Sequence, residues 1–118
     1  MSRRYQDCTT VAGGLRVGIA DDFISRALGL LVGAPLAPRE GLLIAPCSSI
    51  HTFGMRYAID VVFIDSNACV LRVCSSVPAG RMRFVAGARA VLELRAGVAT
   101  RHSLTPGVEL PELADALA

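Results

Sequence analysis

The chain has 118 residues, of which 53% are hydrophobic, and it carries a formal net charge of +2. This length suffices for one domain with its own hydrophobic core, and no run of about 18 apolar residues indicates a membrane helix. The small net charge gives no sign of a polyanionic partner, so we expect neither nucleic acid nor a membrane to bind. The surplus of apolar residues fits a thick core in a monomer or a self-association surface in a homodimer.

The N-terminal third is expected to contain a flexible lead-in, a strand and a helix. Residues 1–14 form the lead-in; they include basic residues with no apolar segment behind them, which argues against a signal peptide and favours a cytoplasmic protein. Residues 15–20 alternate with period two, as a short strand does. Asp21 or Asp22 then supplies the N-cap of the principal helix. The apolar face of this helix carries Phe23, Ala27, Leu30 and Leu31.

The middle of the chain predicts three strands, over residues 41–45, 57–64 and 69–77. The last two form a hairpin with a four-residue turn, in which Asn67 is expected to adopt the left-handed conformation. Residues 57–64 are apolar on both faces, as in a strand buried on two sides, and Asp60 is their only charge. A buried carboxylate needs hydrogen bonds or a cation, or else stays protonated. Asp60 is therefore a structural anchor or part of a site.

The C-terminal part is predicted to be rich in loops. Residues 78–90 are expected to form a loop that holds a cluster of arginines. A further strand follows over residues 91–94 and a short helix over residues 97–103. The tail, residues 111–118, contains a weak helical turn with two leucines on one face. Five or six short strands with one principal α-helix predict a compact, single-domain α+β fold that spans residues 1–118.

Four cysteines, at positions 8, 47, 69 and 74, are spread through the chain without a CxxC pair. This spacing indicates neither a zinc knuckle nor a thioredoxin-type site. In a chain without a secretion signal we expect all four to be free thiols. The sequence also lacks a phosphate loop and any cofactor motif, so we expect no cofactor and no bound metal.

Five short motifs recur in the order and at about the spacing of a known family. They are residues 26–30 (RALGL), 41–43 (GLL), 51–55 (HTFGM), 59–65 (IDVVFID) and 93–97 (ELRAG). Together they resemble the DUF192 family, small bacterial and archaeal proteins without an assigned function. The resemblance implies a compact α+β domain built on a barrel-like, largely antiparallel β-sheet, and it implies no activity. The chain departs from many members at Phe53-Gly54 and at Gly107-Val108, where they carry an aromatic pair and Gly-Asp.

The polar residues around the central strand predict a small pocket. Its candidate members are His51, Thr52, Met55, Asp60 and Glu93. The first two stand at the entry to the strand that carries Asp60, and Glu93 lies on another strand. If these two strands are neighbours, their polar groups line one pocket. We therefore expect a binding module that takes a small molecule, with a few polar groups in an apolar lining.

Two chemical alternatives compete with simple binding, and the sequence leaves open whether the protein is an enzyme. In a hydrolase-like enzyme, Asp60 orients His51, which acts as general base. No nucleophile motif accompanies this pair. In a metal site, the ligands are His51, Asp60 and Glu93 with Cys47 or His102, although no tight ligand spacing points to it.

Two further interpretations require no pocket. The basic loop over residues 78–90 is able to dock a protein ligand, which is a non-enzymatic role. In a purely structural interpretation, Asp60 accepts hydrogen bonds that pin the chain near its strand, and Met55 belongs to the core. Glu93 then pairs with a cation on a neighbouring strand.

Overall fold

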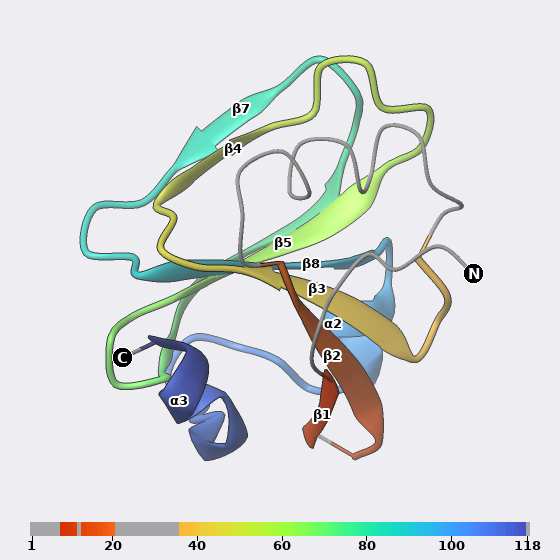
Figure 1. Ribbon diagram of the computed structural model, residues 1–118. Coiled ribbons are helices and arrows are strands. Elements are labelled where there is room, and N and C mark those ends of the chain that lie inside the picture. Colours follow the sequence, from red (N-terminus) through yellow and green to blue (C-terminus); the bar gives the residue numbers. More distant parts are fainter. Residues whose placement is uncertain (1–7, 12, 21–35, 118) are drawn as a thin grey trace.

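The computed structural model describes residues 8–11, 13–20 and 36–117, and its regular secondary structure is mostly β-strand (Figure 1). The main sheet has six strands: β1 (Cys8–Val11), β2 (Leu15–Ala20), β3 (Glu40–Ile44), β5 (Ile59–Ile64), β6 (Val70–Val77) and β8 (Ala90–Arg95). Two more strands, β4 (Ser49–His51) and β7 (Met82–Phe84), pair with each other in a second sheet, here called the ribbon. The described helices are α2 (Val98–Arg101), the 3₁₀ turn η1 (Pro111–Leu113) and α3 (Ala114–Leu117).

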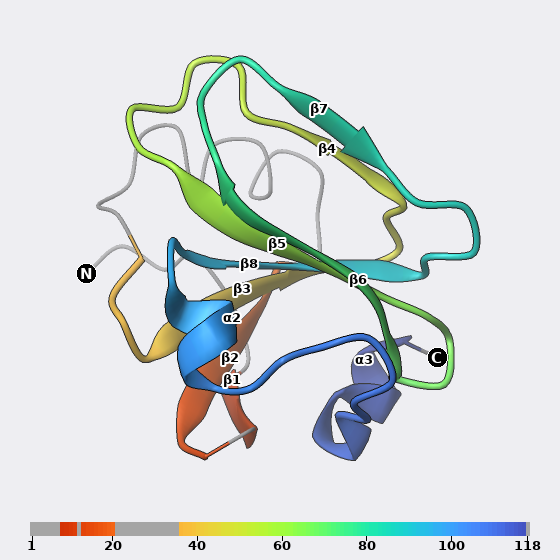
Figure 2. The same ribbon diagram turned by 180° about the vertical axis from the view of Figure 1, so that it is seen from behind.

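The main sheet separates two hydrophobic cores. The ribbon lies above one face of the sheet, and α2 and α3 lie below the other, in both Figure 1 and Figure 2. Side chains alternate along a strand, so Val62 of β5 packs into the helix-side core while Val61 and Phe63 pack into the ribbon-side core. All six residues of β5 are buried. The prediction of a central strand buried on both faces is therefore confirmed.

The sheet is open and of mixed direction. Its strand order is β1-β2-β3-β8-β5-β6, and among the described residues the two end strands are not paired with each other. All neighbouring pairs are antiparallel except β2 and β3, which run parallel. The prediction of a mainly antiparallel sheet is confirmed, but the barrel-like closure is not found. A parallel pair needs a long crossover connection, and residues 21–35 within this connection lie outside the described residues.

The balance of helix and strand also differs from the prediction. The described residues form a mostly β domain with little helix, rather than an α+β fold around one principal helix. The helix predicted to start at Asp21 or Asp22 lies outside the described residues. The predicted short helix near residue 100 is confirmed as α2, and the helical turn of the tail is confirmed by η1 and α3. Leu113 and Leu117 are buried, which fixes this tail against the helix-side core.

Two local predictions are corrected. Residues 8–11, expected in a flexible lead-in, form β1, because β2 offers an antiparallel edge on which they pair. In the hairpin turn, Ala68 rather than Asn67 has the left-handed conformation, with φ 61°. The carboxylate of Asp65 accepts hydrogen bonds from the N–H groups of Asn67 (2.8 Å) and Cys69 (3.0 Å) and so decides where the turn reverses.

Gly41 generates a testable prediction because β3 and β8 approach closely there. A Cβ atom at this position would lie 2.8 Å from Leu94 Cδ2 and 3.0 Å from Leu92 Cδ1, and both leucines are fully buried. We expect Gly41→Ala to lower the free energy of unfolding by about 1–3 kcal/mol through overpacking, measured by denaturant titration. In a Leu94→Val background the same change should be less costly, since the contacting methyl is gone. Equal costs in both backgrounds would contradict this contact.

Candidate functional site

Asp60 is the most completely hydrogen-bonded side chain of the predicted site. Its carboxylate is fully buried and accepts three backbone hydrogen bonds: from Ser76 N–H to Oδ1 (2.8 Å), and from Gly97 N–H and Ala99 N–H to Oδ2 (3.0 Å each). Hydrogen bonds to an ionised acceptor are about twice as strong as neutral ones. With both oxygens occupied by the backbone, the carboxylate needs neither a cation nor a ligand. Asp60 is thus placed as an anchor.

The three donors to Asp60 come from two irregular segments. On β6, Ser75 and Ser76 together stand opposite Asp60, which makes a β-bulge, and Ser76 has φ 50°. Gly97 is the N-cap of α2, and because glycine has no side chain it cannot cap the helix itself. One carboxylate therefore satisfies the N–H that the bulge withdraws from the sheet and the first free N–H groups of α2.

Thr52 is likewise a structural group, at the end of the ribbon. It is fully buried, its hydroxyl lies 2.7 Å from the carbonyl oxygen of Pro78, to which it donates, and it accepts from Arg81 N–H at 2.9 Å. The backbone repeats the link, because Thr52 N–H donates to Arg81 O (2.8 Å) and Gly80 N–H donates to Thr52 O (3.1 Å). Thr52 therefore fastens the turn before β7 to the end of β4.

His51 and Met55, the neighbours of Thr52 in the predicted site, differ in burial: His51 is exposed and Met55 is buried. His51 is exposed on β4, and its ring stacks on Phe53 with 5.2 Å between the ring centroids. Met55 is only 8% exposed and packs into the ribbon-side core. The imidazole is thus part of the surface, while the thioether is part of the interior, as the structural interpretation predicts for Met55.

Glu93 is buried without a hydrogen-bond partner for its Oε1 among the described residues. It lies on β8 between Leu42 of β3 and Val61 of β5, facing the ribbon-side core, and it is 1% exposed. Burial raises the pKa of Glu93 from 4.5 to about 8, because desolvation disfavours the charged form. The predicted cross-strand cation is not found beside it among the described residues.

The structure does not bring the predicted site residues into one pocket. The strands of Asp60 and Glu93 are neighbours, but Asp60 pairs with Leu94 and Val61 pairs with Glu93. The two carboxyl groups therefore point to opposite faces of the main sheet. His51 lies on the ribbon, on the other side of the main sheet from the Asp60 carboxylate, so the two do not form a general-base pair.

The described residues also offer little for a metal. No three side chains of the His, Cys, Asp or Glu type gather in residues 8–11, 13–20 and 36–117 in a way that could hold an ion. Cys47, Cys69 and Cys74 are free thiols and partly buried. In this part of the chain the metal hypothesis built on His51, Asp60 and Glu93 has no supporting geometry.

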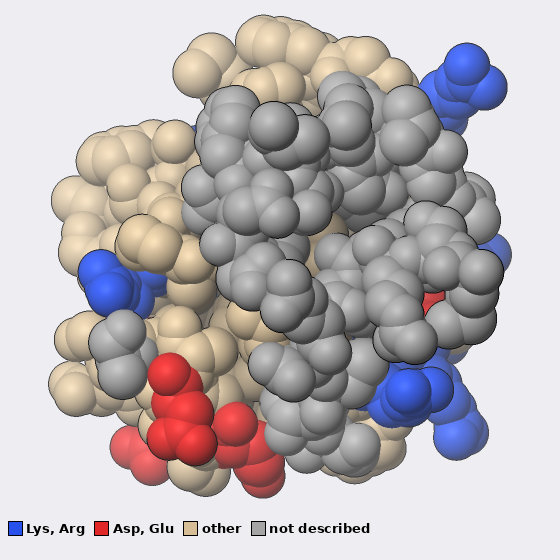
Figure 3. Space-filling view, viewed as in Figure 1, with Lys and Arg blue, Asp and Glu red and all other residues tan. Residues whose placement is uncertain are grey.

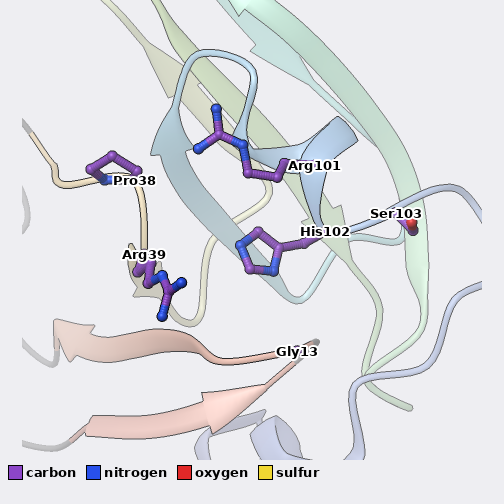
Figure 4. A pocket seen from close by; sticks show the side chains of 6 residues that line it. All are labelled: Gly13, Pro38, Arg39, Arg101, His102 and Ser103. Carbon is purple, nitrogen blue, oxygen red and sulfur yellow. The ribbon is translucent and has the colours of Figure 1, made fainter.

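A depression that the sequence did not predict lies on the helix side of the sheet (Figure 4). Its volume is about 580 Å³, and it is lined by Gly13, Pro38, Arg39, Arg101, His102 and Ser103. These residues come from the β1–β2 turn, the approach to β3 and the end of α2. Their separation in sequence carries no local signal, so only the topology of the fold reveals them.

The outer face of the ribbon is a second feature without an intramolecular role. Cross-strand pairing places His51 opposite Met82 and Ser49 opposite Phe84, on the face away from the core. Met82 and Phe84 are each 65% exposed, and Phe53, just past the end of β4, is 50% exposed. Within the described ranges these three are the exposed large hydrophobic side chains. The predicted basic loop over residues 78–90 therefore contains a strand with an apolar outer face.

Comparison with known proteins agrees with this fold. The family model DUF192, described as uncharacterized ACR, matches residues 7–111. A UPF0127 protein of Pyrococcus horikoshii is 40% identical over 81 residues, which covers 58% of this chain and 68% of the relative.

Two solved structures are similar in fold. One is a candidate transcription regulator of Sinorhizobium meliloti, with a TM-score of 0.71, 24% identity, and 81% of this chain and 80% of that chain covered. The other is a protein of unknown function from Novosphingobium aromaticivorans, with a TM-score of 0.73, 23% identity, and coverage of 87% and 82%. The chain belongs to the DUF192 family, as its motifs predicted. In the described residues, no helix has the length and apolar character needed to cross a membrane.

The anchoring role of Asp60 predicts a large effect of removing its charge. Asp60→Asn keeps the shape but turns an amide NH₂ toward backbone N–H groups, so we expect the free energy of unfolding to fall by about 2–4 kcal/mol. The matched control is Asp65→Asn, because Asp65 accepts both of its hydrogen bonds with a single oxygen, which asparagine retains. The control should change the stability by less than about 0.5 kcal/mol. Equal free energies of unfolding for Asp60→Asn and wild type in denaturant titrations would contradict the anchoring role of Asp60.

The raised pKa of Glu93 predicts a pH-dependent stability. Between pH 4.5 and about 8 the folded state keeps a proton that the unfolded state has released. The free energy of unfolding should therefore fall as the pH rises through this window, by roughly 1 kcal/mol per pH unit, and level off above it. Glu93→Gln cannot titrate, so the difference between wild type and this variant in denaturant titrations isolates the effect. A difference that is independent of pH would mean that Glu93 is ionised in the folded protein.

Proposed function

We propose that this DUF192 domain is a non-catalytic interaction module that docks a partner protein with the outer face of its ribbon. The observation that carries the proposal is the concentration of exposed apolar side chains there. Met82 and Phe84 on the ribbon and Phe53 just past the end of β4 are each at least half exposed. Large apolar groups exposed together on a folded domain are a common mark of an interaction site.

The composition of this face suits an interface more than a solvated surface. Aromatic residues and methionine are enriched in protein interfaces, and exposed Arg81 stands just before β7, whereas Arg83 alternates to the opposite side of the ribbon. The His51–Phe53 stack presents a flat aromatic surface at the end of β4. Thr52 fastens the turn beside it, so the face is held in place before a partner arrives, which lowers the entropic cost of binding.

The charges near the ribbon favour an acidic partner. Arg81 and Arg83 lie on the ribbon and its adjoining turn, whereas exposed acidic residues of the described chain gather at the C-terminal end: Glu109, Glu112 and Asp115. Figure 3 shows red atoms at the lower left, where Figure 1 places α3. A segment with alternating apolar and acidic side chains would match both the apolar and the basic groups of the ribbon.

The geometry gives less support to the other interpretations. A pocket or a general-base pair needs His51 and Asp60 within reach of one ligand, and these side chains lie on opposite sides of the main sheet. Both oxygens of Asp60 already accept backbone hydrogen bonds. A ligand that took them would have to displace the start of α2.

The proposal predicts binding of an acidic, apolar extended peptide. We expect a synthetic peptide of alternating Phe and Glu to bind, and the Met82→Ser/Phe84→Ser variant to bind it at least about tenfold more weakly, since the lost side chains are interface anchors. Isothermal titration calorimetry gives the affinity, and amide shifts in NMR spectra give the location.

Two controls make this test decisive. The Ala96→Ser/Ala114→Ser variant changes two exposed alanines outside the ribbon and should bind as wild type does. A peptide in which Lys replaces Glu should bind poorly, because it meets the same arginines with like charge. Equal binding of both peptides, or no effect of the ribbon variant, would overturn the proposal. Dimerisation of the protein that the ribbon variant abolishes would instead assign this face to a second copy.

A further inference from the structure

We propose that the depression between the β1–β2 turn and α2 binds a small anion of the phosphomonoester class. This site goes beyond the ribbon, because it lies on the other side of the main sheet and shares no residue with it. Its volume of about 580 Å³ falls within the range of small-molecule sites, about 300–1,000 Å³. The fold builds the depression from three separate segments, so it is a product of tertiary structure rather than of one loop.

The lining carries positive charge without a counter-charge. Arg39 and Arg101 are exposed, and within the described ranges neither side chain makes an ion pair or a hydrogen bond. Among the residues that the structure describes, no acidic side chain lines the depression. The acid next in sequence, Glu40, is engaged in its own turn, where its Oε1 accepts from Ala37 N–H at 3.1 Å. Both guanidinium groups line one hollow, so their like charges add up there and would be offset by a bound anion.

Figure 4 shows how the side chains are placed around the hollow. Arg101 and His102 extend from the end of α2 toward the turn that holds Pro38 and Arg39. Ser103 also lines the depression but lies apart from them, farther from Arg39 than His102 does in this view. The donors thus come from two opposite walls, as the binding of a compact ligand requires.

The end of α2 does not oppose an anion strongly. Carbonyl groups at a helix C-terminus usually present partial negative charge. Here they are occupied: Gly97 O accepts from Arg101 N–H, Val98 O from His102 N–H, and Ala99 O from Leu104 N–H. A helix of four residues also has little dipole to contribute. The guanidinium charges therefore dominate the field in the depression.

The charge of the lining favours phosphate over a single carboxylate. A guanidinium fork matches two oxygens of either group, but a phosphomonoester carries about −1.5 to −2 on one compact head and so balances two arginines. The described part of the lining has no Phe, Tyr or Trp on which a nucleobase could stack. A ligand with a phosphate head and a small, non-aromatic body fits these walls best.

Calorimetric titration with inorganic phosphate and with glycerol phosphate tests the site. We expect both to bind wild type, and the Arg39→Gln/Arg101→Gln variant to bind them at least about tenfold more weakly. The matched control is Arg56→Gln/Arg72→Gln, which removes the same charge from two exposed positions outside the depression. This control should weaken binding by less than about twofold. All four positions are exposed, so the fold should survive, and NMR spectra of each variant verify it.

Three outcomes would overturn the inference. Equal weakening by both pairs of substitutions would reduce the effect to net charge alone. Binding of succinate as tight as that of glycerol phosphate would remove the selectivity for phosphate. Absence of phosphate binding at millimolar concentration would remove the site. The ribbon variant Met82→Ser/Phe84→Ser keeps both arginines of the depression, so loss of peptide binding and loss of phosphate binding are separate results.

Discussion

The carboxylate of Asp60 is the interaction on which the arrangement of the layers depends. It joins a central strand of the main sheet to the bulge of β6 and to the first N–H groups of α2. Without it, the buried N–H of Ala99 at the start of α2 would be unpaired, at a cost of about 1–3 kcal/mol, and the N–H groups of Ser76 and Gly97 would lose their partner. The position of α2 in turn sets where Arg101 and His102 stand. A buried anchor therefore determines the geometry of a surface site.

Glu93 makes the opposite contribution one strand away. Both carboxyl groups are buried, but Asp60 has three donors and Glu93 Oε1 has none among the described residues. Neutralising Glu93 avoids the still larger cost of a buried, unpaired charge. The described part of the main sheet therefore holds one carboxyl group with three hydrogen-bond donors and one whose Oε1 has none. The neighbours of Glu93 across the sheet, Leu42 on β3 and Val61 on β5, are apolar and offer no side-chain hydrogen bond.

The sequence predicted those features that depend on local pattern. The two-sided burial of β5, the lone charge at Asp60 and the tail that packs Leu113 and Leu117 all follow from periodicity and are present in the structure. Long-range pairing was not predictable in the same way. A shift of one residue between β5 and β8 would have placed both carboxyl groups on one face, and no local pattern fixes that register. The strand β7 has only three residues, too few for alternation to separate it from a loop.

The most conspicuous polar residues of the sequence are not the best candidates for function, because their contacts depend on long-range pairing that no local pattern reveals. Asp60 and Thr52 are polar residues beside an apolar run, which makes them candidates for a site. Both are fully buried, and their side chains make hydrogen bonds to backbone groups that offset the cost of burial. Once engaged, they cannot bind a ligand without breaking the contacts that hold the fold. Binding then falls to groups that the fold leaves without partners. Among the described residues, the candidates that we propose are the apolar face of the ribbon and the two arginines of the depression, which are ordinary in sequence and are brought together only by the topology.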